Sequence, residues 1–169
     1  MTIKTIKSQT CCFTGHRPKS LPWRYNERSD ACSALKHKLL EQIESAIQDG
    51  YRHFIIGMAQ GIDTYVGELL ILLKRVHPSI TMEAAIPCES QCAKWSKDAK
   101  ERYENIFGWC DKKTMINRYY TPMCMLERNH YMVDQSSRVI AVWNGKPSGT
   151  SNTVNYARKM GVGVVVIDV

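Results

Sequence analysis

The sequence contains no apolar run of the roughly 18 consecutive residues that a membrane-spanning helix requires. Its first ten residues, MTIKTIKSQT, lack the apolar core of a secretory signal. Repeats, low-complexity tracts and linker-like segments are missing as well. We therefore expect a cytoplasmic protein without a membrane partner, whose 169 residues form a single domain over 1–169.

The cysteines indicate neither a disulfide framework nor a metal site. There are seven of them, an odd number, and none forms a CxxC pair. Cys88 and Cys92 lie four residues apart, but no Cys or His cluster nearby completes a zinc set. We expect reduced thiols, no bound metal and no resident cofactor.

Two common phosphate-binding sequences are also absent. No Gly-Lys-Ser/Thr triplet marks a Walker A loop, and no GxGxxG marks a dinucleotide fold. What the chain does have is a net charge of +7, which suits an anionic partner. The basic residues are scattered over expected helix faces, so charge alone does not choose between a phosphorylated small molecule and nucleic acid.

Short apolar runs alternate with amphipathic helical patterns along the chain. Strand patterns cover 10–13, 53–57, 81–86, 113–117, 138–143 and 162–168. Helical patterns cover 29–49, 62–75, 91–107, 123–135 and 151–160. This alternation predicts an α/β fold with a mostly parallel sheet of five to seven strands and helices on both faces. In such sheets, ligands bind beyond the carboxyl ends of the strands.

Glycine-containing loops follow three of the expected strands. They read Gly15-His16-Arg17-Pro18, GMAQGID (57–63) and NGKPSGTSNT (144–153). Glycine lets the backbone turn and approach a ligand closely. The N-terminus of a following helix directs free N–H groups and the positive end of its dipole to the same place. These loops therefore predict an anion-binding rim, for which 144–153 is the stronger signal.

The polar residues in and near these loops permit two interpretations each. Asp63 either caps the helix that begins near it or accepts a hydrogen bond from a ribose hydroxyl. His16 is more often a structural hydrogen bonder than a catalyst. The segment 145–153 is either a turn with a Ser or Thr cap or a cradle for phosphate. Trp143 either stacks on a base or packs in the core.

A further segment, RNHYMVD (128–134), places Arg128 and Asn129 just before an apolar helical turn. These two side chains either contact the phosphate and base of a ligand, or Arg128 pairs with Glu127 or Asp134. The sequence alone leaves both interpretations open.

Together, these motifs resemble those of a known family. In chain order, they are Gly15-His16-Arg17-Pro18, Gly57-Met58-Ala59-Gln60-Gly61-Ile62-Asp63, Arg128-Asn129-x-x-Met132-Val133-Asp134, and Gly149-Thr150-x-x-Thr153-Val154-x-Tyr156-Ala157. From about residue 12 to 166, the chain is similar to the YpsA-like branch of the SLOG superfamily. That superfamily also contains the DNA-processing protein DprA and the LOG phosphoribohydrolases, which activate cytokinins.

The resemblance implies a bacterial protein with a Rossmann-like three-layer sandwich that binds a nucleotide or a nucleotide-derived ligand. Some YpsA-like proteins are linked to bacterial cell division or stress, which favours a regulatory role, with a protein partner and a homo-oligomer left open. By position, the ligand site would comprise Gly15, His16, Arg17, Gly57, Gly61, Asp63, Arg128, Asn129, Asp134, Gly149 and Thr150.

One departure from the superfamily pattern bears on catalysis. The LOG enzymes use a PGGxGTxxE segment whose Glu helps to break an N-glycosidic bond, and Thr153 stands at the position of that Glu here. A threonine cannot act as a carboxylate acid or base near neutral pH. An N-glycosidase acting on nucleotides remains the alternative function, with Asp63 and Asp134 as its candidate catalytic residues.

DNA binding of the DprA kind is the third hypothesis. The chain has no basic stretch interleaved with aromatic residues, as is typical of proteins that bind single strands. The sequence thus argues against nucleic acid as a partner and favours a nucleotide-like small molecule.

Overall fold

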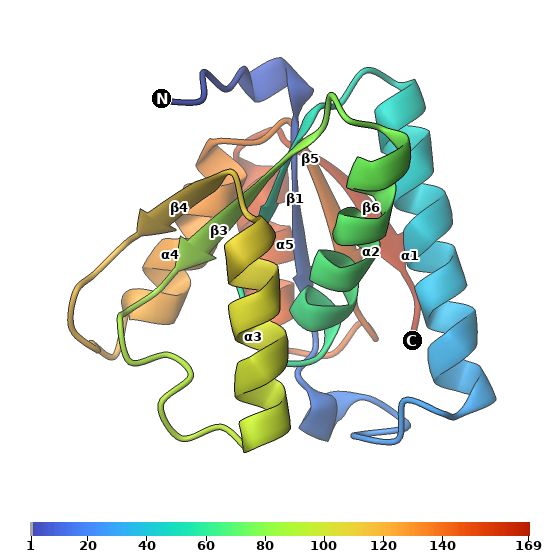
Figure 1. The fold of residues 1–169 in the computed structure, drawn as a ribbon, viewed down its shortest axis with the longest axis vertical. Coiled ribbons are helices and arrows are strands. Elements are labelled where there is room, and N and C mark those ends of the chain that lie inside the picture. Colours follow the sequence, from blue (N-terminus) through green and yellow to red (C-terminus); the bar gives the residue numbers. More distant parts are fainter. Residues whose placement is uncertain (1) are drawn as a thin grey trace.

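The computed structural model describes residues 2–169, which form six strands and five α-helices (Figure 1). The strands are β1 (Thr10–Gly15), β2 (His53–Ile56), β3 (Thr81–Ile86), β4 (Lys112–Met115), β5 (Arg138–Val142) and β6 (Gly163–Ile167). The helices are α1 (Asp30–Gln48), α2 (Ile62–Val76), α3 (Lys97–Trp109), α4 (Cys124–Asp134) and α5 (Gly149–Lys159). Short 3₁₀ turns occupy Lys7–Gln9 and Pro18–Ser20. None of the helices between residues 2 and 169 is both long and apolar enough to cross a membrane.

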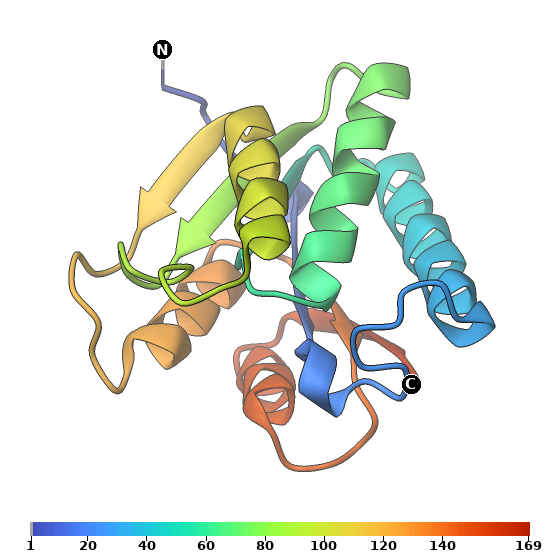
Figure 2. The ribbon, with the colours of Figure 1, turned by 60° about the horizontal axis from the view of Figure 1, so that its bottom comes forward.

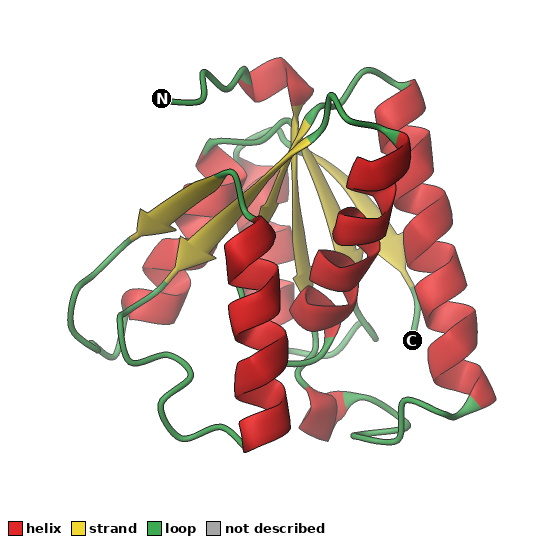
Figure 3. Ribbon diagram, in the orientation of Figure 1, coloured by secondary structure: helices red, strands yellow, loops and turns green. Residues whose placement is uncertain are grey.

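All six strands pair in parallel, in the order β4-β3-β2-β1-β5-β6. Their arrowheads therefore point to one edge of the sheet (Figure 3). The chain adds β2, β3 and β4 successively on one side of β1, then returns through α4 to place β5 on the other side. Because crossover connections are right-handed, this reversal puts α1, α2 and α3 on one face and α4 and α5 on the other (Figure 2). The predicted α/β, Rossmann-like three-layer architecture is confirmed.

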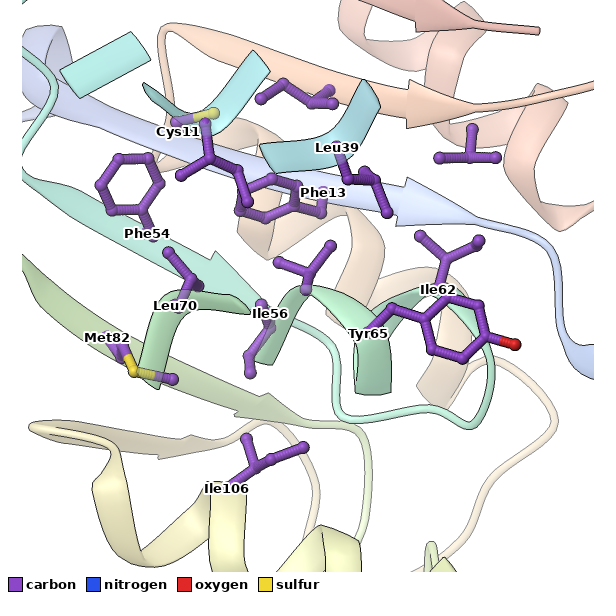
Figure 4. Packing of buried hydrophobic residues seen from close by; sticks show 14 of the residues in the cluster. Cys11, Phe13, Leu39, Phe54, Ile56, Ile62, Tyr65, Leu70, Met82 and Ile106 are labelled. Atoms are coloured by element: carbon purple, nitrogen blue, oxygen red, sulfur yellow. The ribbon is translucent and has the colours of Figure 1, made fainter. Parts of the chain in front are cut away.

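The sheet is buried on both faces because its central strands are apolar on both sides. The larger core cluster lies between the sheet and α1–α3, where Phe13 and Phe54 stack with ring centroids 6.2 Å apart (Figure 4). Burying side chains of this size contributes about 1.5–3 kcal/mol each. A smaller cluster beneath α4 and α5 includes Met132 and Val133, which confirms that this turn of the 128–134 segment is core. The two clusters hold the carboxyl ends of the strands in fixed positions.

The starts of two helices differ from the sequence prediction by two or more residues. The helix predicted over 91–107 begins only at Lys97, because Ser96 caps it: the Ser96 hydroxyl accepts a hydrogen bond of 3.3 Å from the N–H of Ala99. Residues 91–96 form successive turns instead, and this long loop joins β3 to α3 (Figure 3). Conversely, α5 begins at Gly149, two residues earlier than predicted, because Ser148 is its N-cap.

A buried polar network ties three strands of the sheet to α4. Glu83 on β3 is 1% exposed, and its carboxylate lies 2.6 Å from Nε2 of His53. It also accepts hydrogen bonds from the hydroxyls of Thr114 (2.7 Å) and Tyr131 (2.5 Å). Burial alone would raise the pKa of Glu83, but the hydrogen bonds from His53, Thr114 and Tyr131 outweigh it and lower this pKa to about 2.

Replacing Glu83 with Gln should make the fold less stable at neutral pH but not in strong acid. The folded pKa of about 2 lies below the ordinary 4.5, so the carboxylate stabilises the fold fully above about pH 4.5, and the contribution is lost as the pH falls toward 2. We expect Glu83→Gln to lower the free energy of unfolding by about 3 kcal/mol at pH 7. Urea unfolding at pH 7 and at pH 2.5 measures this difference. The exposed Glu44 of α1 supplies the control Glu44→Gln, and an equal loss at both pH values would contradict the prediction.

Candidate functional site

A cavity of about 250 Å³ opens at the carboxyl edge of the sheet. It lies where the order of the strands reverses: β1 and its neighbour β5 lead to helices on opposite faces, which leaves a crevice between their loops. The wall is formed by the end of β1, the loop after β2, the first turn of α2, one side of α4 and the N-terminus of α5. All of these segments except α4 follow strand ends, as the sequence predicted for a ligand site.

Two glycines allow the loops after β1 and β2 to pack directly on one another. A Cβ atom on Gly15 would lie 2.6 Å from side-chain atoms of Ile62, the first residue of α2. Gly61 has a φ of +86°, and a Cβ there would lie 2.7 Å from the carbonyl oxygen of His16. Any larger residue at either position would separate the end of β1 from the N-terminus of α2. Gly61 thus allows the close packing that supports the cavity wall, but it does not itself line the cavity.

His16 is 5% exposed and lines the cavity. Its Nε2 atom accepts a hydrogen bond of 3.2 Å from the backbone N–H of Asn144, just after β5. Because Nε2 is an acceptor, the proton of the neutral ring is on Nδ1. Burial lowers the pKa of His16, which favours this neutral form. The imidazole therefore links the two loops at the strand reversal, which is the structural role expected of it, and keeps an Nδ1–H donor.

Arg128 projects from α4 and is 4% exposed. Its Nη1 atom donates to the carbonyl oxygen of Gly57, and its Nε atom donates to Oδ1 of Asn129 over 2.8 Å. Gly57 has no side chain because the guanidinium occupies that space: a Cβ would lie 2.7 Å from Nη1. Neither Glu127 nor Asp134 pairs with Arg128 within residues 2–169. Burial lowers the pKa of Arg128, an effect that Asp63 opposes, and the side chain keeps its charge.

Asp63 faces Arg128 across Gly57, since a Cβ atom on Gly57 would also lie 3.0 Å from its Oδ2 atom. That oxygen accepts a hydrogen bond of 3.1 Å from the N–H of Ala59. The N-cap of α2 is Gly61, so Asp63 braces the loop after β2 rather than capping the helix. Burial raises the pKa of Asp63, and Arg128, the Ala59 N–H and Arg17 lower it only in part. The carboxyl group is thus a partly buried acid in the cavity wall.

The N-terminus of α5 presents backbone donors to the same space. Ser148 and Ser151 form a capping box: the Ser148 hydroxyl accepts from the N–H of Ser151 (3.1 Å), and the Ser151 hydroxyl accepts from the N–H of Ser148 (2.6 Å). The N–H groups of Gly149 and Thr150 have no hydrogen-bond partner in the described part of the chain. The serine cap and the phosphate cradle proposed for this loop are therefore compatible, because the cap leaves two N–H groups free.

Arg17 completes the mouth of the cavity. Its side chain is exposed, lines the opening, and makes no ion pair or side-chain hydrogen bond to any residue in 2–169. The site therefore combines one free guanidinium, one buried guanidinium, and two free N–H groups at the positive end of a helix dipole. Such a set of donors suits an anion.

The cavity brings together nearly all of the residues predicted from the sequence. Those that line it are Gly15, His16, Arg17, Gly57, Asp63, Arg128, Asn129, Gly149 and Thr150. Asp134 does not: it is the exposed last residue of α4, where its carboxylate accepts a hydrogen bond of 2.7 Å from Tyr156. Because α4 runs antiparallel to the strands, its C-terminus lies at the opposite edge of the sheet.

Other residues of the wall were not among the predicted site residues. Ser20 and Met125 line the cavity, as does Ser148, which lies within the predicted 145–153 loop. Met125 lies three residues before Arg128 on the same side of α4, and this spacing was the one signal available for it. Trp143, considered as a base-stacking residue, instead donates to the carbonyl of Lys146 (2.7 Å) and packs against the smaller core cluster. Thr153, at the position of the LOG glutamate, donates to the carbonyl of Gly149 over 3.1 Å.

The chain matches the model of a known protein family. A family model for YpsA, described as the YspA SLOG family, matches residues 11–161. The chain belongs to this family. Relatives of the YpsA-family protein include the uncharacterized SPbeta prophage-derived protein YoqJ of Bacillus subtilis, 36% identical in an alignment of 143 residues that covers 76% of this chain and 83% of YoqJ. A UPF0398 protein of Halalkalibacterium halodurans is 25% identical over 151 residues, 87% of this chain and 79% of that protein.

Among solved structures, the YpsA-family protein is similar to DNA processing protein A from Helicobacter pylori, which binds single-stranded DNA. The TM-score is 0.60 at 16% sequence identity. The match covers 95% of this chain but only 65% of the other. At this identity, the likeness establishes the shared fold.

The YpsA-family site is built from donors and one acid. Within residues 2–169, no three His, Cys, Asp or Glu side chains converge in a way that could hold a metal ion. The groups that face the cavity are the cationic Arg17 and Arg128 and backbone N–H donors, with Asp63 as a hydrogen-bond acceptor or, when protonated, a donor.

Replacing Gly57 with Ala should destabilise the protein by about 1–3 kcal/mol. The added Cβ would lie 2.7 Å from Nη1 of the buried Arg128. That atom cannot move away without losing its hydrogen bond to the Gly57 carbonyl. Thermal unfolding measures the change. Gly108 in α3 is the matched control, since a Cβ there meets nothing within 4 Å; Gly108→Ala should be neutral or slightly stabilising. Equal effects of the two substitutions would contradict the packing argument.

Proposed function

We propose that this protein binds a nucleotide or a nucleotide-derived ligand in the cavity at the carboxyl edge of the sheet and has a regulatory role. The observation that carries the proposal is the unpaired guanidinium of Arg17 on the same cavity as the two free N–H groups of Gly149 and Thr150. A phosphate group is the ligand that such a combination binds best, because it accepts several charge-assisted hydrogen bonds at once.

The remaining polar residues fit the rest of a nucleotide. Asp63 would accept a hydrogen bond from a ribose hydroxyl, and Nδ1–H of His16 would donate to a phosphate or sugar oxygen. Arg128 would add positive potential without direct contact being required, since its Nη1 and Nε atoms already donate to Gly57 and Asn129. A ligand-dependent signal to a protein partner is the regulatory role that such binding would serve.

Replacing Arg17 with Ala should weaken binding of 5′-AMP about tenfold to a hundredfold and leave binding of adenosine unchanged, because the guanidinium would contact phosphate alone. Isothermal titration calorimetry with both ligands measures the two affinities. Arg158 is exposed in the last turn of α5, so Arg158→Ala is the control that removes the same amount of charge. Equal loss of affinity for AMP and adenosine would refute the assignment of Arg17 to phosphate.

An N-glycosidase is the second candidate, and the position of Asp63 favours it. A carboxyl group with a raised pKa in the cavity wall has the properties of a general acid that protonates a leaving base. Should incubation with 5′-nucleotides release free base, Asp63→Asn should abolish the release. Asp134→Asn should retain it, since Asp134 lies outside the cavity. Release that survives Asp63→Asn would remove this candidate, and chromatography of the reaction mixture decides the question.

The shared fold with DNA processing protein A, which binds single-stranded DNA, weighs against the expectation that nucleic acid is not a partner. Lys19 and the exposed Arg17 lie beside a second, aromatic-lined cavity, which one or two nucleotides of a strand would suit. Binding of a strand would lose affinity steeply with rising salt as several phosphate contacts release counterions. Among residues 2–169, the groups suited to an anion gather around one small cavity, which favours a small ligand over a strand.

A further inference from the structure

A second cavity of about 220 Å³ adjoins the first one. Arg17, Ala59 and Met125 line both cavities, so the two spaces meet at these residues. Ligand pockets commonly measure about 300–1,000 Å³. Neither cavity reaches that size by itself, whereas together they do.

The second cavity differs from the first in chemical character. Two aromatic side chains, Tyr25 and Trp95, line it beside polar side chains such as Gln91, whereas the first cavity has mostly guanidinium groups, hydroxyls and backbone N–H groups beside a few apolar side chains. The indole of Trp95 makes an edge-to-face contact with Tyr103, with ring centroids 5.6 Å apart and an interplanar angle of 85°. Trp95 is thus held in place rather than free to rotate. Tyr25 is 63% exposed on the loop that follows the first 3₁₀ turn after β1.

Gln91 joins the two cavities through hydrogen bonding. Its Nε2 atom donates over 3.1 Å to the carbonyl of Gly57, the same oxygen that accepts from Arg128. Only the nitrogen of the Gln91 carboxamide can donate to the Gly57 carbonyl. This bond therefore fixes which side of the carboxamide faces Gly57. Its Oε1 atom is buried and has no hydrogen-bond partner among residues 2–169. Gln91 thus lines the second cavity and, through the Gly57 carbonyl, is tied to the wall of the first.

We propose that the second cavity is a nucleobase subsite, in which the base packs on Trp95 and Tyr25 while the phosphate occupies the first cavity. This inference rests on the proposed function. Arg17 lies at the junction, where the sugar and phosphate of a nucleotide would pass from one cavity to the other. Base–aromatic stacking tolerates any base, because every base presents a flat π surface. The ligand class is thus a purine or pyrimidine nucleotide rather than a sugar phosphate.

The test compares 5′-AMP with ribose 5-phosphate, which lacks the base, by isothermal titration calorimetry. We expect AMP to bind at least tenfold more tightly to the unaltered protein. Trp95→Ala and Tyr25→Ala should each reduce that advantage severalfold while leaving ribose 5-phosphate binding unchanged. Arg17→Ala should instead weaken both ligands by the same factor.

Two tyrosine variants separate a loss of base binding from a loss of folding. Tyr25 is mostly exposed, so Tyr25→Ala can be measured even where Trp95→Ala fails to fold; Tyr119, 70% exposed and outside both cavities, supplies the control Tyr119→Ala. Equal affinity for AMP and ribose 5-phosphate, with the Arg17→Ala effect intact, overturns the base subsite and preserves the phosphate site. Failure of both ligands to bind removes the proposed function itself.

Discussion

The carbonyl oxygen of Gly57 holds together the whole edge of the sheet where the cavities lie. It accepts hydrogen bonds from Arg128 on one face of the sheet and from Gln91 on the loop that crosses the other side of the edge. A buried guanidinium needs such an acceptor, because an unpaired charge inside a protein costs far more than a neutral polar group. Gly57 must lack a side chain to admit it. The positions of α4 and of the loop after β3 thus depend on one backbone atom.

This arrangement leaves an excess of positive charge beside an accessible cavity. Asp63 compensates Arg128 only in part, since burial raises the pKa of Asp63. Arg17 and the free N–H groups at the start of α5 add to the excess. Stability and recognition are therefore linked: the core fixes the strand ends, the strand ends fix the loops, and the loops assemble a field that a phosphate would neutralise. Anion binding at this edge would relieve the repulsion between Arg17 and Arg128.

Most of the architecture could be predicted because the strands are short, apolar on both faces and separated by regular helical patterns. The rim was predictable for the same reason, since parallel strands must bring Gly15, Gly57 and Gly149 to one edge. Asp134 could not be placed correctly, because it lies six positions after Arg128 along α4, which brings it to the other edge. The turns over 91–96 resembled a helix because their apolar spacing is helical, while Ser96 supplied the cap that begins the real one. Trp95 was not singled out with them, whereas Trp143 was considered as a base-stacking residue.

The loop between β3 and α3 contributes side chains to the second cavity, and this bears on how related proteins can differ. Gly15 and Gly57 in the first cavity pack so closely against Ile62 and Arg128 that substitutions there are costly. Tyr25 and Trp95 in the second cavity stand on loops, which tolerate exchange and insertion. Exchanges at a few loop positions would therefore reshape the second cavity while leaving the scaffold and the first cavity unchanged.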